Sequence, residues 1–170
     1  MADIFISYWA GEQGVATSLY DFVTTSLPDK TTIFMADSGT IRAGDNWLDI
    51  IKRELKESKV VLSILSTDSV KRPWINFEAG AAWIDKILIP LCFGLLEKGN
   101  MPAPYNQLQV LQLREPLDVH RLVEDLYWHL ALGEPPIFIP MLMTSSSQPE
   151  HQQRIRHFVA DIQDFERDGV

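Results

Sequence analysis

The sequence predicts an α/β domain with a central parallel sheet of about five strands, flanked by helices. Short apolar runs rich in β-formers recur along the chain, at residues 3–7, 31–35, 59–66 and 87–93. Segments with apolar residues at helical spacing separate these runs, and the chain shows no internal repeat. Strands that alternate with helices favour a parallel sheet with right-handed crossovers, because each parallel pair needs a long connection.

The first half of the chain signals where its helices begin and end. A helix predicted from about residue 13 to 27 stops before a proline. A polar loop with two glycines, residues 36–46, precedes a second helix that Asp45 or Asn46 can cap. Pro73 suits the first turn of a third helix, because its ring presets φ and it has no N–H to satisfy.

The second half is less regular. Residues 108–113 predict a short fifth strand, and residues 118–132 predict a closing helix with a leucine face. We divide the chain into a domain at 1–133 and an extension at 134–170, because proline-rich and serine-rich segments begin there. An amphipathic helix predicted at 150–166 ends the extension. It packs back on the domain, joins a partner protein, or starts a region of a larger sensor protein.

Composition excludes several classes of function. The chain has 170 residues with a net charge of −8, which disfavours nucleic-acid and anionic-membrane binding. Its single cysteine, Cys92, lies in an apolar run and is expected to be a core residue, so no disulfide forms within the chain. No apolar segment approaches bilayer length and the first residues lack a secretory signal, so we expect a cytoplasmic protein. No zinc-ligand spacing is present, and we expect no metal.

Polar residues follow the predicted strand ends, where parallel sheets place their ligand sites. Ser7 follows the first strand, and residues 37–46 and 67–78 follow the second and third. Glu78 lies in a mostly apolar stretch, and a carboxylate is rarely buried without a partner. Trp74 lies four residues earlier, on the same face of a helix. An indole beside a partly desolvated acid could hold an aromatic cation.

Several motifs in this order resemble the Toll/interleukin-1 receptor (TIR) domain family. Asp3-Ile4-Phe5-Ile6-Ser7-Tyr8 looks like its opening strand, and Arg42-Ala43-Gly44-Asp45-Asn46-Trp47 is similar to its long loop and second helix. Val60-Val61-Leu62-Ser63-Ile64-Leu65-Ser66 and Trp74-x-x-x-Glu78 complete the series, so the resemblance covers about residues 3–132. It implies a flavodoxin-like three-layer fold with a five-stranded parallel sheet.

The resemblance also implies one of two functions. Many bacterial and plant members cleave the nicotinamide–ribose bond of NAD+, whereas many animal members only assemble with other TIR domains. Glu78 matches the catalytic glutamate of the cleaving members, and Trp74 matches their tryptophan. We therefore predict a bacterial-type enzyme that makes nicotinamide and ADP-ribose or a cyclic isomer. NAD+ is its substrate, no other cofactor is expected, and the domains self-associate; a role in antiphage defence follows by analogy.

Further substrate-binding residues are predicted around Glu78. Tyr8 and Trp9 offer flat faces for adenine or nicotinamide. Ser7 and Ser38 are hydroxyl donors that can help to keep the acid ionised. Asp37 lies in the same loop as Ser38, and Arg42 can pair with a pyrophosphate.

Two other interpretations remain open. In a non-catalytic TIR docking module, Glu78 would lie in solvent on an amphipathic helix and Trp74 would be a half-buried packing residue. A nucleoside deoxyribosyltransferase-like enzyme is another α/β protein with a catalytic glutamate, but it acts on deoxynucleosides. Trp47 and Trp83 are expected in the core, and the four histidines lie in the last third, away from this site.

Overall fold

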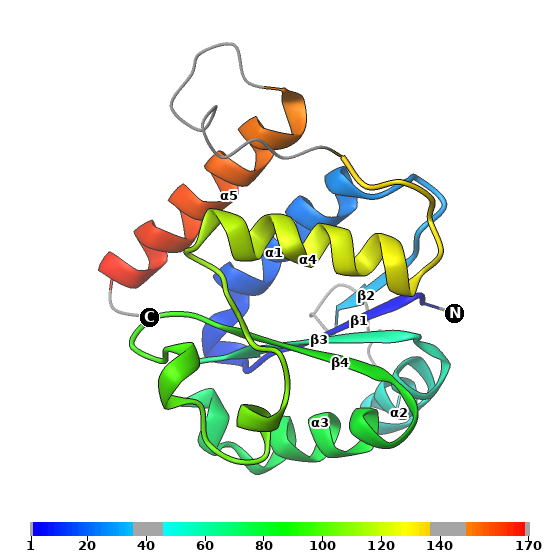
Figure 1. Ribbon diagram of the computed structural model, residues 1–170. Coiled ribbons are helices and arrows are strands. Elements are labelled where there is room, and N and C mark those ends of the chain that lie inside the picture. Colours follow the sequence, from blue (N-terminus) through cyan, green and yellow to red (C-terminus); the bar gives the residue numbers. More distant parts are fainter. Residues whose placement is uncertain (1, 36–45, 137–148, 169–170) are drawn as a thin grey trace.

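A computed structural model describes residues 2–35, 46–136 and 149–168 and shows a three-layer α/β fold, as predicted (Figure 1). Its central sheet has five parallel strands in the order β2-β1-β3-β4-β5. The strands are β1 (Ile4–Ser7), β2 (Ile33–Met35), β3 (Val60–Leu65), β4 (Ile87–Cys92) and β5 (Leu111–Gln112).

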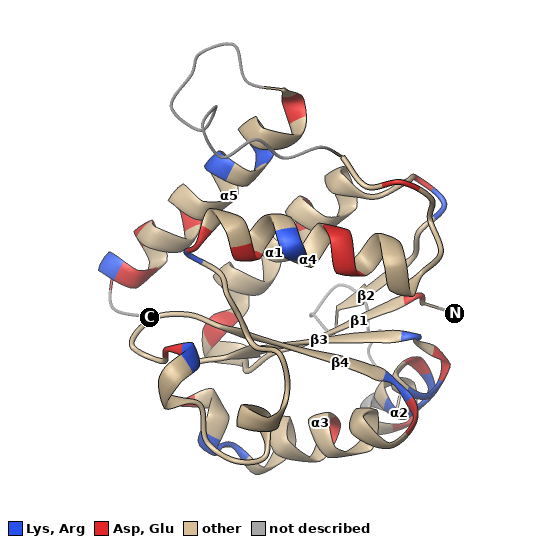
Figure 2. Ribbon diagram, in the orientation of Figure 1, with Lys and Arg blue, Asp and Glu red and all other residues tan. Residues whose placement is uncertain are grey.

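The central strands are buried and uncharged, as expected for a sheet covered on both faces. All four residues of β1 and all six of β3 are buried. In Figure 2 the charged residues lie on helices, in loops and beside the strand ends, while the strands themselves are tan. The register pairs Ile4 with Val60 and Ser7 with Ser63, so the polar ends of β1 and β3 lie side by side.

Helices cover both faces of the sheet (Figure 1). On one face lie α1 (Gln13–Ser26), α4 (Pro116–His129) and α5 (Glu150–Arg167); on the other lie α2 (Trp47–Glu57) and α3 (Pro73–Asp85). Because strand side chains alternate, Ile4 and Ile6 belong to the core under α1, while Phe5 belongs to the core over α2 and α3. The side chain of Trp47 lies outside the described part, and Trp83 is half-buried.

Two predicted elements have different bounds in the structure. The fifth strand is only Leu111–Gln112, much shorter than the predicted 108–113, because only these two residues pair with β4, at Leu91 and Cys92. The closing helix α4 starts at Pro116 rather than 118, with proline in its first turn. It ends at His129 rather than 132, because Ala131 has a φ of 53° that breaks the helical path.

The C-terminal helix α5 packs back on the domain, against α1 and α4. Ile155 and Ile162 are fully buried there, and the ring of Phe158 stacks on that of Phe22 with centroids 4.7 Å apart. Of the three alternatives for this segment, the first is therefore the one observed. The division of the chain at residue 133 stays a prediction.

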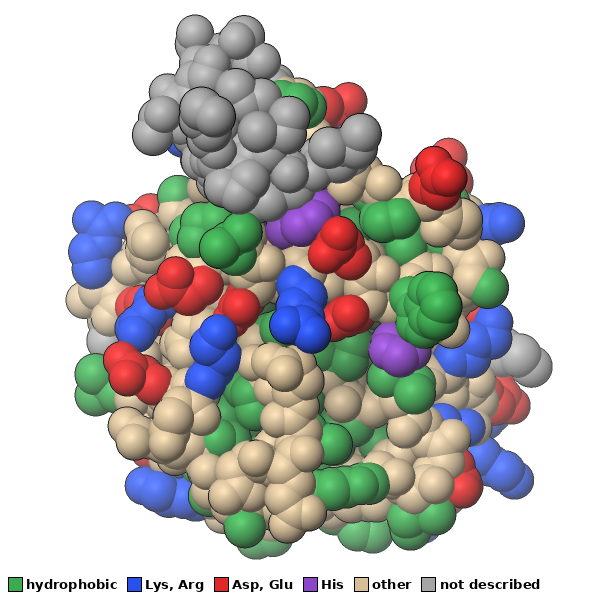
Figure 3. Space-filling view, in the orientation of Figure 1, with side chains coloured by type: hydrophobic (Ala, Val, Ile, Leu, Met, Phe, Trp, Pro, Cys, Tyr) green, Lys and Arg blue, Asp and Glu red, His purple; other side chains and the backbone are tan. Residues whose placement is uncertain are grey.

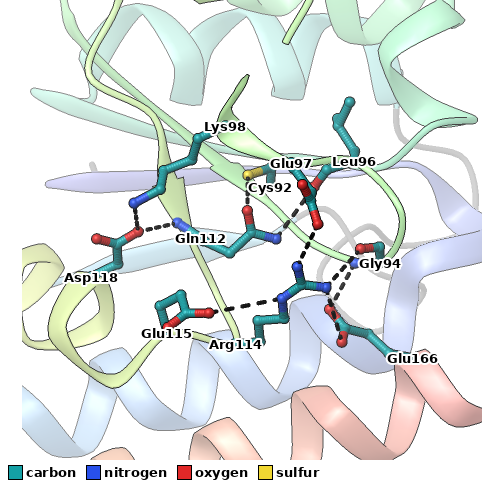
Figure 4. A network of polar contacts seen from close by, with 10 residues as sticks. All are labelled: Cys92, Gly94, Leu96, Glu97, Lys98, Gln112, Arg114, Glu115, Asp118 and Glu166. Atoms are coloured by element: carbon teal, nitrogen blue, oxygen red, sulfur yellow. Dashed lines mark hydrogen bonds and ion pairs between the residues drawn. The ribbon is translucent and has the colours of Figure 1, made fainter. Parts of the chain in front are cut away.

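Polar contacts fasten the ends of β4 and β5 to the loops and to α5 (Figure 4). The Cys92 thiol donates to Gln112 Oε1 over 3.2 Å, and Gln112 Nε2 donates to the Leu96 carbonyl over 3.3 Å. Glu166 of α5 accepts from the Gly94 amide at 2.8 Å, and Arg114 donates to the Gly94 carbonyl at 3.3 Å. Cys92 is fully buried in the core, as predicted, and this burial raises the pKa of its thiol to about 12.

Candidate active site

The candidate site forms where α3 passes the carboxyl end of β1. Pro73 starts α3, and Glu78 lies in its second turn with only 3% of its surface exposed. Ser7, the last residue of β1, donates its hydroxyl proton to Glu78 Oε2 over 2.5 Å. A contact between residues 71 positions apart fixes the acid at the strand end. The alternative of a solvent-exposed acid is wrong, because Glu78 lies on the inner, buried face of α3.

Burial dominates the electrostatics of Glu78. Loss of hydration raises the pKa of the carboxyl, while hydrogen bonds from the side chains of Ser7 and Trp74 lower it without cancelling the rise. None of the described basic residues forms an ion pair with this carboxylate. The acid therefore depends on neutral donors for its ionised form, which leaves its charge available to a cationic ligand.

A cavity of about 390 Å³ opens beside the carboxylate. It is lined by Phe5, Ile6, Ser7, Tyr8, Trp9, Ala10, Ile51, Arg72, Pro73, Trp74, Ile75 and Glu78. Five of the eight predicted site residues thus meet at one hollow, although they come from two distant segments. The other three, Asp37, Ser38 and Arg42, lie outside the described residues.

Two charged residues near the site were not predicted. Arg72 lines the cavity, and its guanidinium carbon lies 4.3 Å from the centroid of a Trp9 ring. Glu12 is 1% exposed and accepts hydrogen bonds from the Ser66 hydroxyl at 2.5 Å and from the Trp9 amide at 3.4 Å. Burial raises the pKa of Glu12, opposed by these donors and by Ser69. Glu12 therefore joins the loop after β1 to the loop after β3.

The sequence contains no motif or spacing that would mark Arg72 or Glu12 as site residues. A lone arginine before a proline and a lone glutamate before a helix are both common surface features. Their roles depend on a contact between two loops that are far apart in sequence. Only the choice of Trp9 as an aromatic site residue pointed in this direction.

The histidines lie elsewhere, as predicted. His120 Nδ1 and His151 Nε2 are 3.2 Å apart in the layer of α4 and α5. Burial, with His120 and Arg154 nearby, lowers the pKa of His151 to about 4, so it is neutral at physiological pH. Within the described ranges, no three His, Cys, Asp or Glu side chains gather as metal ligands. None of the described helices is long and apolar enough to cross a bilayer.

Comparison with known proteins supports the fold and identifies the family. A family model described as "TIR domain" matches residues 4–127. The TIR domain of the Toll-related receptor TRR-2 from Hydra magnipapillata is 16% identical with a TM-score of 0.58, covering 74% of this chain and 98% of that one. Among curated proteins, none matches the sequence.

A second similar structure is a metazoan TIR-STING receptor from C. gigas in complex with 2′,3′-cGAMP. It is 20% identical with a TM-score of 0.56, over 82% of this chain and 41% of the receptor. At these identities the likeness shows a shared fold and no more. The family match spans the sheet and both walls of the cavity, from β1 to most of α4. The chain belongs to the TIR-domain family.

Proposed function

We propose that this TIR domain cleaves the bond between nicotinamide and ribose in NAD+. The observation that supports it is the buried Glu78 carboxylate, hydrogen-bonded by Ser7 and facing a cavity that Trp9 and Trp74 line. Members of the family include NAD+-cleaving enzymes and scaffolds. A scaffold has no need for a desolvated acid beside a cavity, because removing a carboxylate from water costs stability even when neutral donors bind it.

The proposed reaction breaks the C–N glycosidic bond. Nicotinamide is a cation in NAD+ and leaves as a neutral molecule that takes the bonding pair, so no general acid is needed. The ribose is left with oxocarbenium character, and the ionised Glu78 stabilises this positive charge or binds the ribose hydroxyls. Water then adds at the anomeric carbon and loses a proton to give ADP-ribose. Attack by the adenine of the same molecule would give the cyclic product instead.

Purified protein incubated with NAD+ tests the proposal. Chromatography should detect nicotinamide with ADP-ribose or its cyclic isomer, and the assay should span low to high protein concentration because the domains are proposed to self-associate. Glu78→Gln should retain the fold and lose cleavage by at least about 10²-fold, as expected when a charge that acts in the transition state is removed. Asp85→Asn, on the exposed end of α3, is the matched control and should retain activity. Full activity of Glu78→Gln would remove Glu78 from the mechanism.

A second candidate function is a non-catalytic docking module. The observation that favours it is the outer face of α3, where Phe77 is 53% and Ile84 is 82% exposed. Self-association without release of nicotinamide at any protein concentration would support this function. A panel that includes deoxynucleosides would detect the deoxyribosyltransferase alternative. The antiphage role and the cytoplasmic location stay predictions.

A further inference from the structure

We propose that Arg72, held in place by Trp9, is the phosphate-binding residue of the cavity and sets the direction in which the dinucleotide enters. This inference rests on the proposed function, because it places the two ends of NAD+ relative to Glu78. The nicotinamide riboside end would lie at the buried acid, and the pyrophosphate would lie at the exposed arginine.

The cavity has one positive and one negative side chain at different depths. Among the described residues that line it, Arg72 and Glu78 are the only charged ones. Glu78 is 3% exposed, whereas Arg72 is exposed just before the first turn of α3. NAD+ has a cationic nicotinamide ring at one end and an anionic pyrophosphate in the middle. Only one orientation brings both groups of the ligand to charges of opposite sign.

Arg72 is available for an anion. None of the described carboxylates lies within ion-pair distance of its guanidinium, whereas Arg53, Arg114 and Arg154 each pair with a glutamate. Its described side-chain contact is with the Trp9 ring, at 4.3 Å. A cation–π contact with the face of an indole does not occupy the guanidinium N–H groups as an ion pair would, so they can still bind phosphate oxygens.

The position of Trp9 is fixed by the residues that follow it, Gly11 and Glu12. A Cβ atom on Gly11 would lie 2.4 Å from Trp9 Cζ3, so the indole occupies the space that a larger residue at position 11 would need. The Trp9 amide donates to Glu12 at 3.4 Å, and Glu12 is held by Ser66 at 2.5 Å. Glu12 and Gly11 are therefore positioning residues for the ring. A ring fixed in this way orders the arginine before ligand arrives, which lowers the entropy lost on binding.

Arg72→Met tests the inference with substrates that differ in phosphate. Methionine keeps an unbranched chain without the charge. We expect the KM for NAD+ to rise about 10-fold or more, the range of a lost hydrogen bond to a charged group, with kcat little changed. For nicotinamide riboside, which has no phosphate, kcat/KM should stay within about twofold of wild type. Lys71→Met, an adjacent exposed cation that does not line this cavity, is the matched control.

Gly11→Ala tests the fixed position of Trp9 without touching the ligand. The added methyl should displace the Trp9 ring and raise the KM for NAD+ in the same direction as Arg72→Met. Combining both substitutions should give little more than Arg72→Met alone, because both act through one group. A fully additive double variant would overturn the role of Trp9 in holding Arg72. Circular dichroism melts confirm that each variant is folded.

Binding measurements separate this inference from the proposed reaction. Calorimetry with ADP-ribose and adenosine should show that Arg72→Met weakens only ADP-ribose, and that added salt weakens ADP-ribose binding in wild type more than in the variant. If wild type binds ADP-ribose through Arg72 but releases no nicotinamide, the reaction fails and the phosphate site stands. Equal losses for NAD+ and nicotinamide riboside, or no loss for either, would overturn the phosphate site while the reaction stands. Wild type that neither cleaves NAD+ nor binds ADP-ribose would overturn both.

Discussion

Neutral hydrogen-bond donors, Ser7 and Trp74, stabilise the ionised form of the buried Glu78 carboxylate. Its carboxylate is 3% exposed, and the Ser7 hydroxyl at 2.5 Å supplies one of the hydrogen bonds that replace lost water. Burial raises the pKa of this acid, while Ser7 and Trp74 oppose the rise. Both the pH dependence of the proposed reaction and that of folding stability follow from this balance.

Ser7→Ala should move the acidic limb of the rate profile to higher pH. The proposed reaction needs the ionised acid, so kcat should increase as pH rises through the pKa of Glu78. Removing the Ser7 donor destabilises the carboxylate and raises its pKa further. The measurement is kcat for NAD+ cleavage across acidic and neutral pH. Ser63→Ala is the control, because this neighbouring serine is fully buried and its hydroxyl has no described partner; a limb that moves equally in both variants would contradict the assignment.

Glu78→Gln should gain stability relative to wild type as pH rises. The folded-state pKa of Glu78 lies above its ordinary value, so the folded protein binds more protons and wild-type stability falls as pH rises through that interval. The amide has no such loss. Thermal melts should therefore show a larger Tm difference in favour of Glu78→Gln at pH 7.5 than at pH 4. The effect of Glu12, whose pKa is also raised, cancels in this difference.

The sequence predicted five residues that line the cavity, because each follows a strand end or shares a helix face: Ser7, Tyr8, Trp9, Trp74 and Glu78. It did not predict Arg72 or Glu12. Arg72 matters through its contact with the Trp9 ring, and Glu12 through its hydrogen bond from Ser66, and neither partner is close in sequence. Such contacts depend on how two loops meet in space, which periodicity does not report.

Helix α5 is the element outside the family resemblance that contributes most to the hydrophobic core. It lies beyond the matched residues 4–127, yet Ile155, Phe158 and Ile162 belong to the main core. The amphipathic stripe predicted the helix and its inner face. The stripe could not predict that the helix packs on α1 and α4, because an amphipathic helix of this kind can pack on any apolar face of the domain. Glu166 then ties the end of α5 to Gly94, beside β4 (Figure 4).

Phe158→Ala should destabilise the whole domain. The ring is 3% exposed and stacks on Phe22, so its removal leaves a cavity and costs about 3–5 kcal/mol in unfolding free energy. Chemical denaturation followed by circular dichroism measures the change. Asp161→Ala, on the exposed side of α5, should change stability by no more than about 0.5 kcal/mol. A similarly small effect of Phe158→Ala would show that α5 is not a structural part of the domain in solution.

Across the whole molecule, charged side chains are spread over the surface, whereas a group of exposed apolar side chains lies on the outer face of α3. In Figure 3 acidic and basic side chains are interspersed over the face drawn there. The outer face of α3 instead presents Phe77, Gly80, Ala81 and Ile84 to solvent, at the spacing of one helical stripe. The alternation of strands and helices predicted the layers and the parallel sheet. It did not predict this stripe, since an apolar helix is normally expected to be buried on all sides.

Ile84→Ser should weaken self-association. Its side chain is 82% exposed and lies at the end of α3 away from the cavity, so the change removes apolar contact area without touching the site. We expect sedimentation to show fewer oligomers, and NAD+ cleavage per molecule to rise only at higher protein concentration than in wild type. Trp128→Ser, equally exposed at 82% but on α4, is the control. Loss of oligomers in Trp128→Ser with none in Ile84→Ser would assign association to the opposite layer.

The chemistry of Cys92 offers a practical route to such measurements. Its thiol is buried, and burial raises its pKa to about 12, so at pH 7 very little of it is the reactive thiolate. The chain contains no other cysteine. A single cysteine introduced on the surface would therefore take up a maleimide dye or spin label alone, and distances between labelled copies could be measured without first deleting the native thiol.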